Sequence, residues 1–162
     1  MYKKEIIMPV EIPGYGTLDI EHLVFDYNGT LADGGIVMSG AADLINRLAR
    51  TYKIHVITAD TFNTVKKELE GVNCSVVVIP GSNQSLAKLD YINKLGKEKC
   101  AAIGNGNNDG LMLKEAALGI AIIGDEGAFT STVLSSDIVC RNIAHAMELF
   151  LDTKRLIATM RS

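Results

Sequence analysis

Polar residues close three of the apolar runs in this chain, where a folded protein could bind a ligand. The closing residues are Asp26, Thr58 and Asn105, and a second carboxylate, Asp109, follows shortly after the third. A threonine hydroxyl and the backbone amides at the start of a helix can donate hydrogen bonds to phosphate oxygens. Glycine at position 29 lets the backbone bend closely around such a ligand. These residue types therefore suggest a polar binding site that several segments build together.

The segments that must position these residues alternate between short β-branched runs and stretches of helical period. The expected strands are 22–26, 53–58, 74–79, 99–105, 119–124 and 137–140, helices are expected between them, and a final helix begins at about Asn142. Several strands are apolar on both faces, which is typical of a parallel sheet covered by helices on both sides. The pattern predicts a doubly wound α/β fold, Rossmann-like, with the strand ends of interest along one edge.

The N-terminal stretch IIMPVEIPGYGTLDI has a different pattern. Its PG and YG turn signals predict a β-hairpin within residues 1–20 that extends or flanks the sheet. The whole chain of 162 residues has the length of one ordinary domain, which we place at 1–162. We find no repeat, low-complexity tract or linker in it.

Composition and charge argue against several classes of partner. The net charge is -3 and the basic residues are scattered, so a nucleic-acid partner is not expected. No apolar run approaches the roughly 20 residues of a membrane helix, so we expect no membrane partner. The N-terminal apolar stretch is interrupted by Pro9, Glu11 and Pro13, which argues against a signal peptide.

Cysteines and histidines show no ligand spacing. Cys74, Cys100 and Cys140 are odd in number, form no CxxC pair and lie in or beside apolar runs, so we interpret them as buried, reduced thiols. This interpretation fits a reducing compartment, and we expect a cytoplasmic protein. The three histidines, at 22, 55 and 145, are interpreted as packing or surface residues.

Four stretches resemble, in residue type and order, the four motifs of the haloacid dehalogenase-like (HAD) phosphotransferases. They are DYNGT at 26–30, ITAD at 57–60, Lys88 and GNGNND at 104–109. Within that superfamily they look most like the phosphorylation domain of P-type ATPases, with its DKTGT, TGD, lysine and GDGxND. The resemblance covers roughly residues 20–140. It implies a HAD-like fold and Mg²⁺-dependent phosphoryl transfer.

The resemblance also implies a role for each matching residue. Asp26 corresponds to the nucleophile that becomes an aspartyl phosphate, and Thr58, Ala59 and Lys88 correspond to the groups that hold the transferred phosphoryl. Its implied Mg²⁺ ligands are Asp26, Asn28 through its backbone carbonyl, Asn105 and Asp109. Physical chemistry agrees, because a carboxylate attacks a phosphate dianion only where a divalent cation and an ammonium group offset the negative charge.

Two positions depart from the family pattern. The residue two after the nucleophile is usually an aspartate that acts as general acid and base, and here it is Asn28, which has no titratable proton. General acid–base assistance contributes about 10²- to 10⁴-fold in rate, so we expect slow hydrolysis. Asn105 replaces an aspartate that usually binds magnesium directly, and its amide oxygen brings no charge. We therefore expect weaker metal binding.

The spans between the motifs are filled by the expected strands and helices. They leave no room for a cap domain or an ATP-binding insert. An uncapped cleft stays open unless a neighbouring subunit covers it, so we expect a homo-oligomer. The expected substrate is a phosphorylated small molecule or macromolecule.

Two function classes remain open. One is a slow Mg²⁺-dependent phosphohydrolase or phosphotransferase acting through Asp26. The other is a non-catalytic phosphate-ligand-binding or regulatory module, for which Asn28 and Asn105 are the cue. A carbon–halogen hydrolase is less favoured because it normally carries a cap. Taken singly, Asp26 and Thr58 could also be capping residues and Lys88 a solvated lysine.

Overall fold

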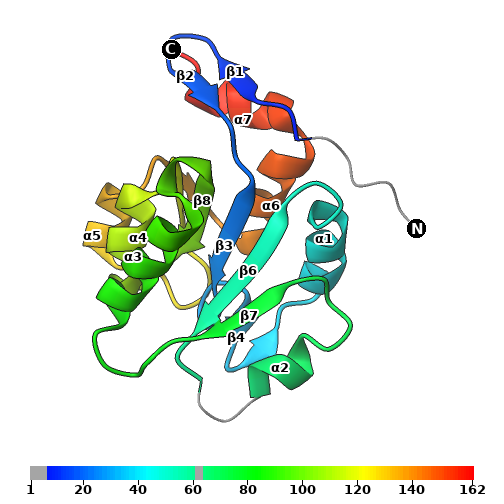
Figure 1. The fold of residues 1–162 in the computed structure, drawn as a ribbon, viewed down its shortest axis with the longest axis vertical. Helices are drawn as coiled ribbons and strands as arrows, with labels where there is room; N and C mark the ends of the chain where they lie inside the picture. Colours follow the sequence, from blue (N-terminus) through cyan, green and yellow to red (C-terminus); the bar gives the residue numbers. More distant parts are fainter. Residues whose placement is uncertain (1–6, 61–63) are drawn as a thin grey trace.

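A parallel sheet of six strands lies at the centre of the computed structural model, which describes residues 7–60 and 64–162 (Figure 1). The strand order is β10-β9-β8-β3-β6-β7. The strands are β3 (His22–Asp26), β6 (Lys53–Thr58), β7 (Ser75–Val78), β8 (Cys100–Gly104), β9 (Leu118–Ile122) and β10 (Ile138–Cys140). The chain enters this sheet at β3, near the middle, and continues outward through β6 to β7. It then crosses back to β8, on the other side of β3, and continues outward through β9 to β10. The predicted doubly wound α/β fold is confirmed.

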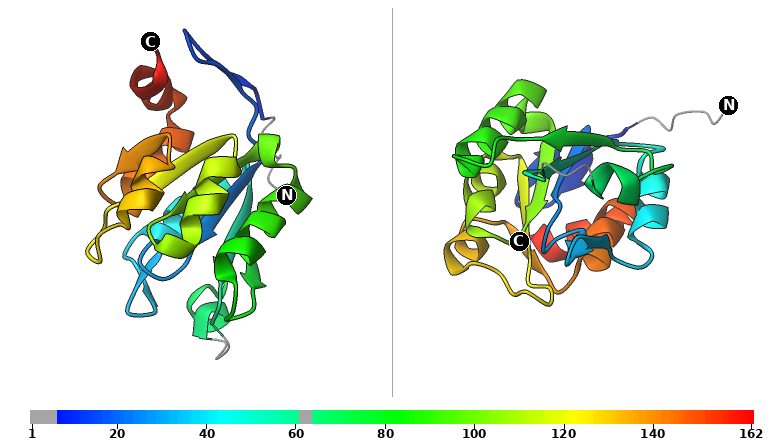
Figure 2. Two further views of the ribbon diagram at one scale, coloured as in Figure 1. Left: turned by 90° about the vertical axis from the view of Figure 1, so that its left-hand side faces the viewer. Right: turned by 90° about the horizontal axis from the view of Figure 1, so that it is seen from below.

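Helices cover both sides of the sheet, as Figure 2 shows. One apolar cluster joins sheet residues to α3 (Gln84–Leu95) and α4 (Gly110–Glu115), with α5 (Thr130–Leu134) beside them. The other cluster contains residues of α1 (Ala41–Leu48), α6 (Ile143–Leu151) and α7 (Thr153–Met160), and Val65 of α2 (Thr64–Glu68). Strand β3 contributes Val24 to the first cluster and Leu23 and Phe25 to the second. Because side chains alternate along a strand, an apolar run such as HLVF fits a sheet buried on both faces.

Close packing of α4 on the sheet explains one glycine. A Cβ on Gly119, in β9, would lie 2.2 Å from the carbonyl oxygen of Leu113 in α4. That oxygen belongs to the helix backbone, so it cannot move aside as a flexible side chain would. Glycine at this position lets helix and strand approach closely.

Two hairpins flank the sheet. Strands β1 (Val10–Ile12) and β2 (Gly16–Leu18) form the expected N-terminal hairpin as a separate sheet beside the C terminus (Figure 1). Residues 1–6 of the predicted 1–20 segment lie outside the described residues. The second hairpin pairs β4 (Ala32–Asp33) with β5 (Ile36–Val37) and was not predicted. Gly34 and Gly35, with φ of 56° and 84°, form its two-residue turn, which favours glycine at both positions.

The final helix differs from its prediction. It begins as expected after Asn142, whose side chain accepts a hydrogen bond from the backbone N–H of His145. A single continuous helix is wrong, however, because the backbone of Asp152 leaves the helical region at φ -130° and ψ 88°. The Asp152 carboxylate then accepts from the N–H of Lys154 and caps α7.

The described residues form no helix of the length and apolarity that crossing a bilayer requires. The three cysteines are free, and burial raises the pKa of each thiol. Cys100 is fully buried as predicted, whereas Cys74 and Cys140 are only partly buried.

Two histidines and a tyrosine form a hydrogen-bonded chain that begins at the start of β3. The Nδ1 atom of His22 lies 2.9 Å from Nε2 of His55, and Nδ1 of His55 lies 2.8 Å from the hydroxyl of Tyr91. Burial, followed by the charges of His22 and Lys53, lowers the pKa of His55 to about 4. The folded protein therefore favours the neutral imidazole. His22 and His55 are packing residues, as predicted.

The lowered pKa of His55 predicts that the stability of the protein depends on pH. An unfolded histidine binds a proton near pH 6.5, whereas folded His55 resists protonation down to about pH 4. Its contribution is thus present above pH 6.5 and is lost as the pH falls from 6.5 toward 4. Between pH 7.5 and 5, we expect wild type to lose on the order of 1–2 kcal/mol more unfolding free energy than His55→Gln in urea titrations.

Asp26 titrates in the same pH range but is present in both proteins, so the difference between them isolates His55. Parallel pH profiles for wild type and His55→Gln would contradict this explanation.

Candidate active site

Three neighbouring strands bring the predicted residues to one edge of the sheet. Asp26 ends β3, Thr58 ends β6 and Asn105 follows β8, and these strands are adjacent in the order β8-β3-β6. A cleft of about 580 Å³ opens at this edge. Six predicted site residues line it: Asp26, Asn28, Thr58, Ala59, Lys88 and Asn105. The structure therefore brings them together, while Asp109 lies just beneath the cleft surface.

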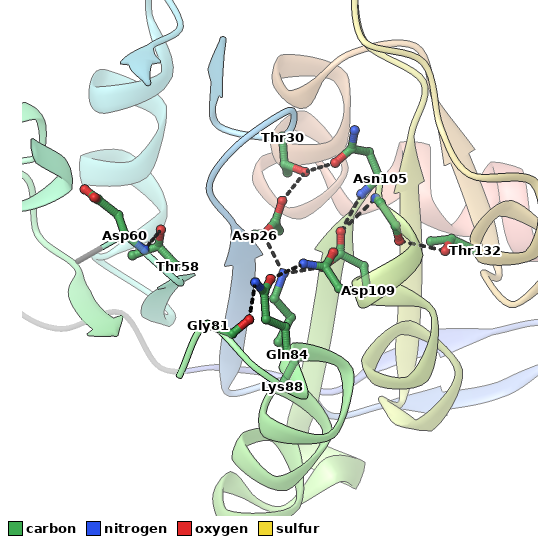
Figure 3. Close-up of polar contacts among 12 residues, drawn as sticks. Asp26, Thr30, Thr58, Asp60, Gly81, Gln84, Lys88, Asn105, Asp109 and Thr132 are labelled. Carbon is green, nitrogen blue, oxygen red and sulfur yellow. Dashed lines mark hydrogen bonds and ion pairs between the residues drawn. The ribbon is translucent and has the colours of Figure 1, made fainter. Parts of the chain in front are cut away.

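A buried lysine joins two of the carboxylates at the floor of the cleft (Figure 3). The Nζ atom of Lys88, from α3, lies 2.5 Å from Oδ1 of Asp26 and 2.6 Å from Oδ1 of Asp109. The Lys88 side chain is 1% exposed, Asp26 10% and Asp109 0%. The interpretation of Lys88 as a solvated surface residue is thus excluded.

The charges of this cluster do not balance. Burial raises the pKa of Asp26, the charge of Asp109 raises it further, and Lys88 opposes both, so the pKa lies at about 7. Burial alone would lower the pKa of Lys88, but the two carboxylates outweigh it and the pKa lies above its usual value. The ammonium group therefore stays charged. When both carboxylates are ionised, they carry one negative charge more than this ammonium group neutralises. A cation at Asp26 would stabilise the ionised form of that carboxylate.

Asp109 is committed to contacts within the protein. Its Oδ2 accepts hydrogen bonds from the backbone N–H groups of Asn105 and Gly106, each at 2.9 Å, while Oδ1 faces Lys88. A Cβ on Gly104 would lie 2.5 Å from Cγ of Asp109, which explains the glycine that opens GNGNND. Asp109 thus shapes the loop after β8 and holds Lys88, and a role as a magnesium ligand remains a prediction.

The turn after β3 connects Asp26 to Asn105. The Thr30 hydroxyl lies 3.3 Å from both Oδ2 of Asp26 and Oδ1 of Asn105. The other end of the Asn105 amide, Nδ2, donates to the carbonyl of Gly127 at 3.2 Å. Gly29 adopts φ 77°, a left-handed conformation that favours glycine. Asn28, before it, is exposed at the cleft.

Thr58 and Asp60 lie on the opposite side of Asp26 from Asn105 (Figure 3). The Thr58 hydroxyl oxygen accepts from the N–H of Asp60 at 3.1 Å, so its hydrogen remains available to a ligand. The Asp60 carboxylate accepts from the N–H of Val65 at 3.2 Å and from the hydroxyl of Thr64. Asp60 therefore caps the start of α2, whereas Thr58 can serve a ligand.

Three further polar residues of the cleft were missed by the sequence analysis: Thr64, Gln84 and Glu126. Asn108, in the GNGNND motif, also lines the cleft. Gln84 Oε1 accepts from Nδ2 of Asn108 at 2.6 Å, which ties α3 to the loop after β8. Gln84 precedes Lys88 by four residues, so helical spacing places both on one face. Glu126 follows a strand that ends at the same edge as β3, and this position was the signal that could have identified it.

Comparisons with known proteins identify the fold. No protein-family model matches the chain. The 3-deoxy-D-manno-octulosonate 8-phosphate phosphatase of Moraxella catarrhalis, solved with magnesium, phosphate and the sugar acid, is 20% identical, with a TM-score of 0.65. That match covers 89% of this chain and 95% of the other. A candidate HAD superfamily (subfamily III A) hydrolase of Legionella pneumophila is 16% identical, with a TM-score of 0.67 and coverage of 88% of each chain.

These likenesses show that the chain has the HAD-like fold, and the structure shows no cap domain in the described residues. A closer relative in sequence is the uncharacterised protein MJ0073 of Methanocaldococcus jannaschii. It is 53% identical over 83 residues, which cover 49% of this chain and 89% of the relative. The chain belongs to the same protein family as this archaeal relative.

Proposed function

We propose that this protein is a Mg²⁺-dependent phosphohydrolase or phosphotransferase that acts slowly through an aspartyl phosphate on Asp26. The observation that carries the proposal is the buried ammonium group of Lys88 between Asp26 and Asp109, at the floor of an open cleft. The fold likeness to a phosphatase solved with magnesium and phosphate supports it.

The residues at the cleft suit a hard cation. Magnesium prefers oxygen ligands, and the proposed ones are Asp26, the backbone carbonyl of Asn28, the amide oxygen of Asn105 and Asp109. Among the described residues, no group of three or more His, Cys, Asp or Glu side chains could hold a metal ion. When bound, Mg²⁺ would offset the negative charge of Asp26 and of a substrate phosphate.

The residues of the cleft have different roles in the two proposed steps of the reaction. An Asp26 oxygen forms a bond to phosphorus while the bond from phosphorus to the substrate oxygen breaks. Lys88, the Thr58 hydroxyl and the N–H of Ala59 hold the phosphoryl oxygens as charge develops on them. In the second step, a water oxygen attacks phosphorus, which releases phosphate and restores the Asp26 carboxylate.

Asn28 limits the rate in this proposal. Its exposed side chain lies at the cleft but can neither give a proton to the leaving group nor take one from the attacking water. The aspartyl phosphate would therefore persist, as the resemblance to P-type ATPases implies. ATP hydrolysis is not part of this proposal, because strands and helices fill the described spans between the motifs and leave no room there for an ATP-binding insert.

A second candidate function is a phosphate-ligand-binding or regulatory module without catalysis. The observation that favours it is the engagement of Asn105, whose amide is held by Thr30 on one side and Gly127 on the other. Either function would suit a phosphorylated small molecule or macromolecule in an open cleft.

A homo-oligomer and a cytoplasmic location are further proposals. The exposed Ile36, on the hairpin beside the cleft, supports the homo-oligomer.

The covalent step predicts a labelled adduct. Wild type incubated with Mg²⁺ and ³²P-acetyl phosphate should carry a hydroxylamine-sensitive label, because acyl phosphates react with hydroxylamine. Asp26→Asn should carry none, and Asp43→Asn, at an exposed position of α1, should be labelled like wild type. Absence of label on wild type, combined with stabilisation by Mg²⁺ and phosphate in thermal unfolding, would favour the binding module instead.

The missing proton relay predicts a gain of function. Asn28→Asp should raise phosphomonoester turnover by about tenfold or more, since a carboxyl at this position can transfer protons. The measurement is kcat with p-nitrophenyl phosphate, together with the lifetime of the labelled adduct. Asn28→Ser, which adds no group that titrates near neutral pH, should remain as slow as wild type. Equal rates for Asn28→Asp and wild type would show that the slow turnover has another cause.

A further inference from the structure

The loop between β9 and α5 is held against the cleft by Asn105. Nδ2 of Asn105 donates to the carbonyl of Gly127, and the backbone carbonyl of Asn105 accepts from the N–H of Phe129 at 2.9 Å. On the other side of the loop, Gly124 packs against the carbonyl of Gly29. The segment 124–127 is thus fixed beside the turn that follows the Asp26 strand.

This arrangement places a carboxylate next to the Asn105 amide. A Cβ on Gly29 would lie 2.6 Å from Oε2 of Glu126, 2.6 Å from Nδ2 of Asn105 and 2.9 Å from its Oδ1. The Glu126 carboxylate and the Asn105 amide therefore face the same small volume above Gly29. Both side chains line the cleft that contains Asp26.

Among the described acidic residues of the cleft, Glu126 is the one whose carboxylate forms no hydrogen bond or ion pair with another described residue. Among the described residues, three acidic side chains line this cleft: Asp26, Asp60 and Glu126. Asp26 is paired with Lys88, and Asp60 caps the start of α2. Glu126 is exposed, and no hydrogen bond or ion pair joins its carboxylate to another described residue. Its oxygens are therefore available to a ligand.

The amide at position 105 and the carboxylate at position 126 are complementary. Only an amide can both accept from Thr30 and donate to the carbonyl of Gly127, so an aspartate at 105 would lose the contact that fixes the loop. An aspartate at 105 would also place a second negative charge beside Glu126. Asn105 brings no negative charge to the site, but the loop that its amide holds carries one on Glu126.

We infer that Glu126 is a ligand of the divalent cation and supplies the carboxylate charge that Asn105 does not bring. This inference rests on the proposed function, because it assigns a residue to the cation of that same site. A carboxylate is a stronger ligand for Mg²⁺ than an amide oxygen, since it adds charge attraction to the hard oxygen contact. Glu126 thereby raises the affinity of a site whose other proposed anionic ligands are Asp26 and Asp109.

The test measures Mg²⁺ binding rather than turnover. Titration of the protein with MgCl₂ by isothermal calorimetry, in the presence of inorganic phosphate, gives the dissociation constant directly. Glu126→Gln should weaken Mg²⁺ binding by about tenfold or more. Asp125→Asn is the matched control, because Asp125 is an exposed acid in the same loop that does not line the cleft, and it should bind within about twofold of wild type.

A swap variant provides a second comparison. In the Glu126→Gln background, Asn105→Asp should recover much of the lost Mg²⁺ affinity, because the carboxylate returns to the cation. Thermal unfolding without Mg²⁺ checks that Glu126→Gln folds like wild type, as expected for an exposed side chain.

The outcomes separate this inference from the proposed function. If wild type and Glu126→Gln bind Mg²⁺ equally and Asp26→Asn does not bind it, the assignment of Glu126 is overturned while the proposed site stands. If wild type itself binds no Mg²⁺ in the presence of phosphate, the proposed function fails, and the inference fails with it.

Discussion

The burial of one ammonium group between two carboxylates determines how this site is organised. Removing Lys88, Asp26 and Asp109 from water costs several kcal/mol per ion, which a single pairwise attraction does not offset. Further hydrogen bonds to Asp109 from the loop after β8, and contacts of Asp26 with the turn after β3, are therefore required. Because apolar side chains of similar volume often stabilise a protein as well as a buried ion pair, this cluster is better explained by chemistry than by stability.

The same constraint links the fold to the cleft. The cluster forms only if the end of β3, the first turns of α3 and the loop after β8 converge, and the strand order β8-β3-β6 produces this convergence. The two asparagines then modify the chemistry without dismantling the cluster. Asn28 lies exposed at the cleft, where it removes a proton relay, and Asn105 exchanges a charge for a hydrogen bond to Gly127.

Much of this arrangement followed from the sequence because it depends on local patterns. Apolar runs marked the six strands to within a few residues, and parallel pairing placed Asp26, Thr58 and Asn105 at one edge. The commitment of Asp109 to Lys88 and to backbone amides depends on side-chain geometry that spacing does not encode. Two other features did have a local signal in the sequence. Glu126 is an acid that follows a strand, and the helix break at Asp152 coincides with an Asp–Thr pair. Stronger periodic patterns nearby outweighed both signals.

A crystal structure of the protein grown with MgCl₂ and beryllium fluoride tests the central claim most directly. Beryllofluoride imitates a phosphoryl group bound to a carboxylate. The account predicts that it is bonded to an oxygen of Asp26, with fluorines facing the ammonium group of Lys88 and the hydroxyl of Thr58. Crystals with saturating beryllofluoride and a clear cleft, in which Asp26 contacts only Lys88 and Thr30, would contradict it.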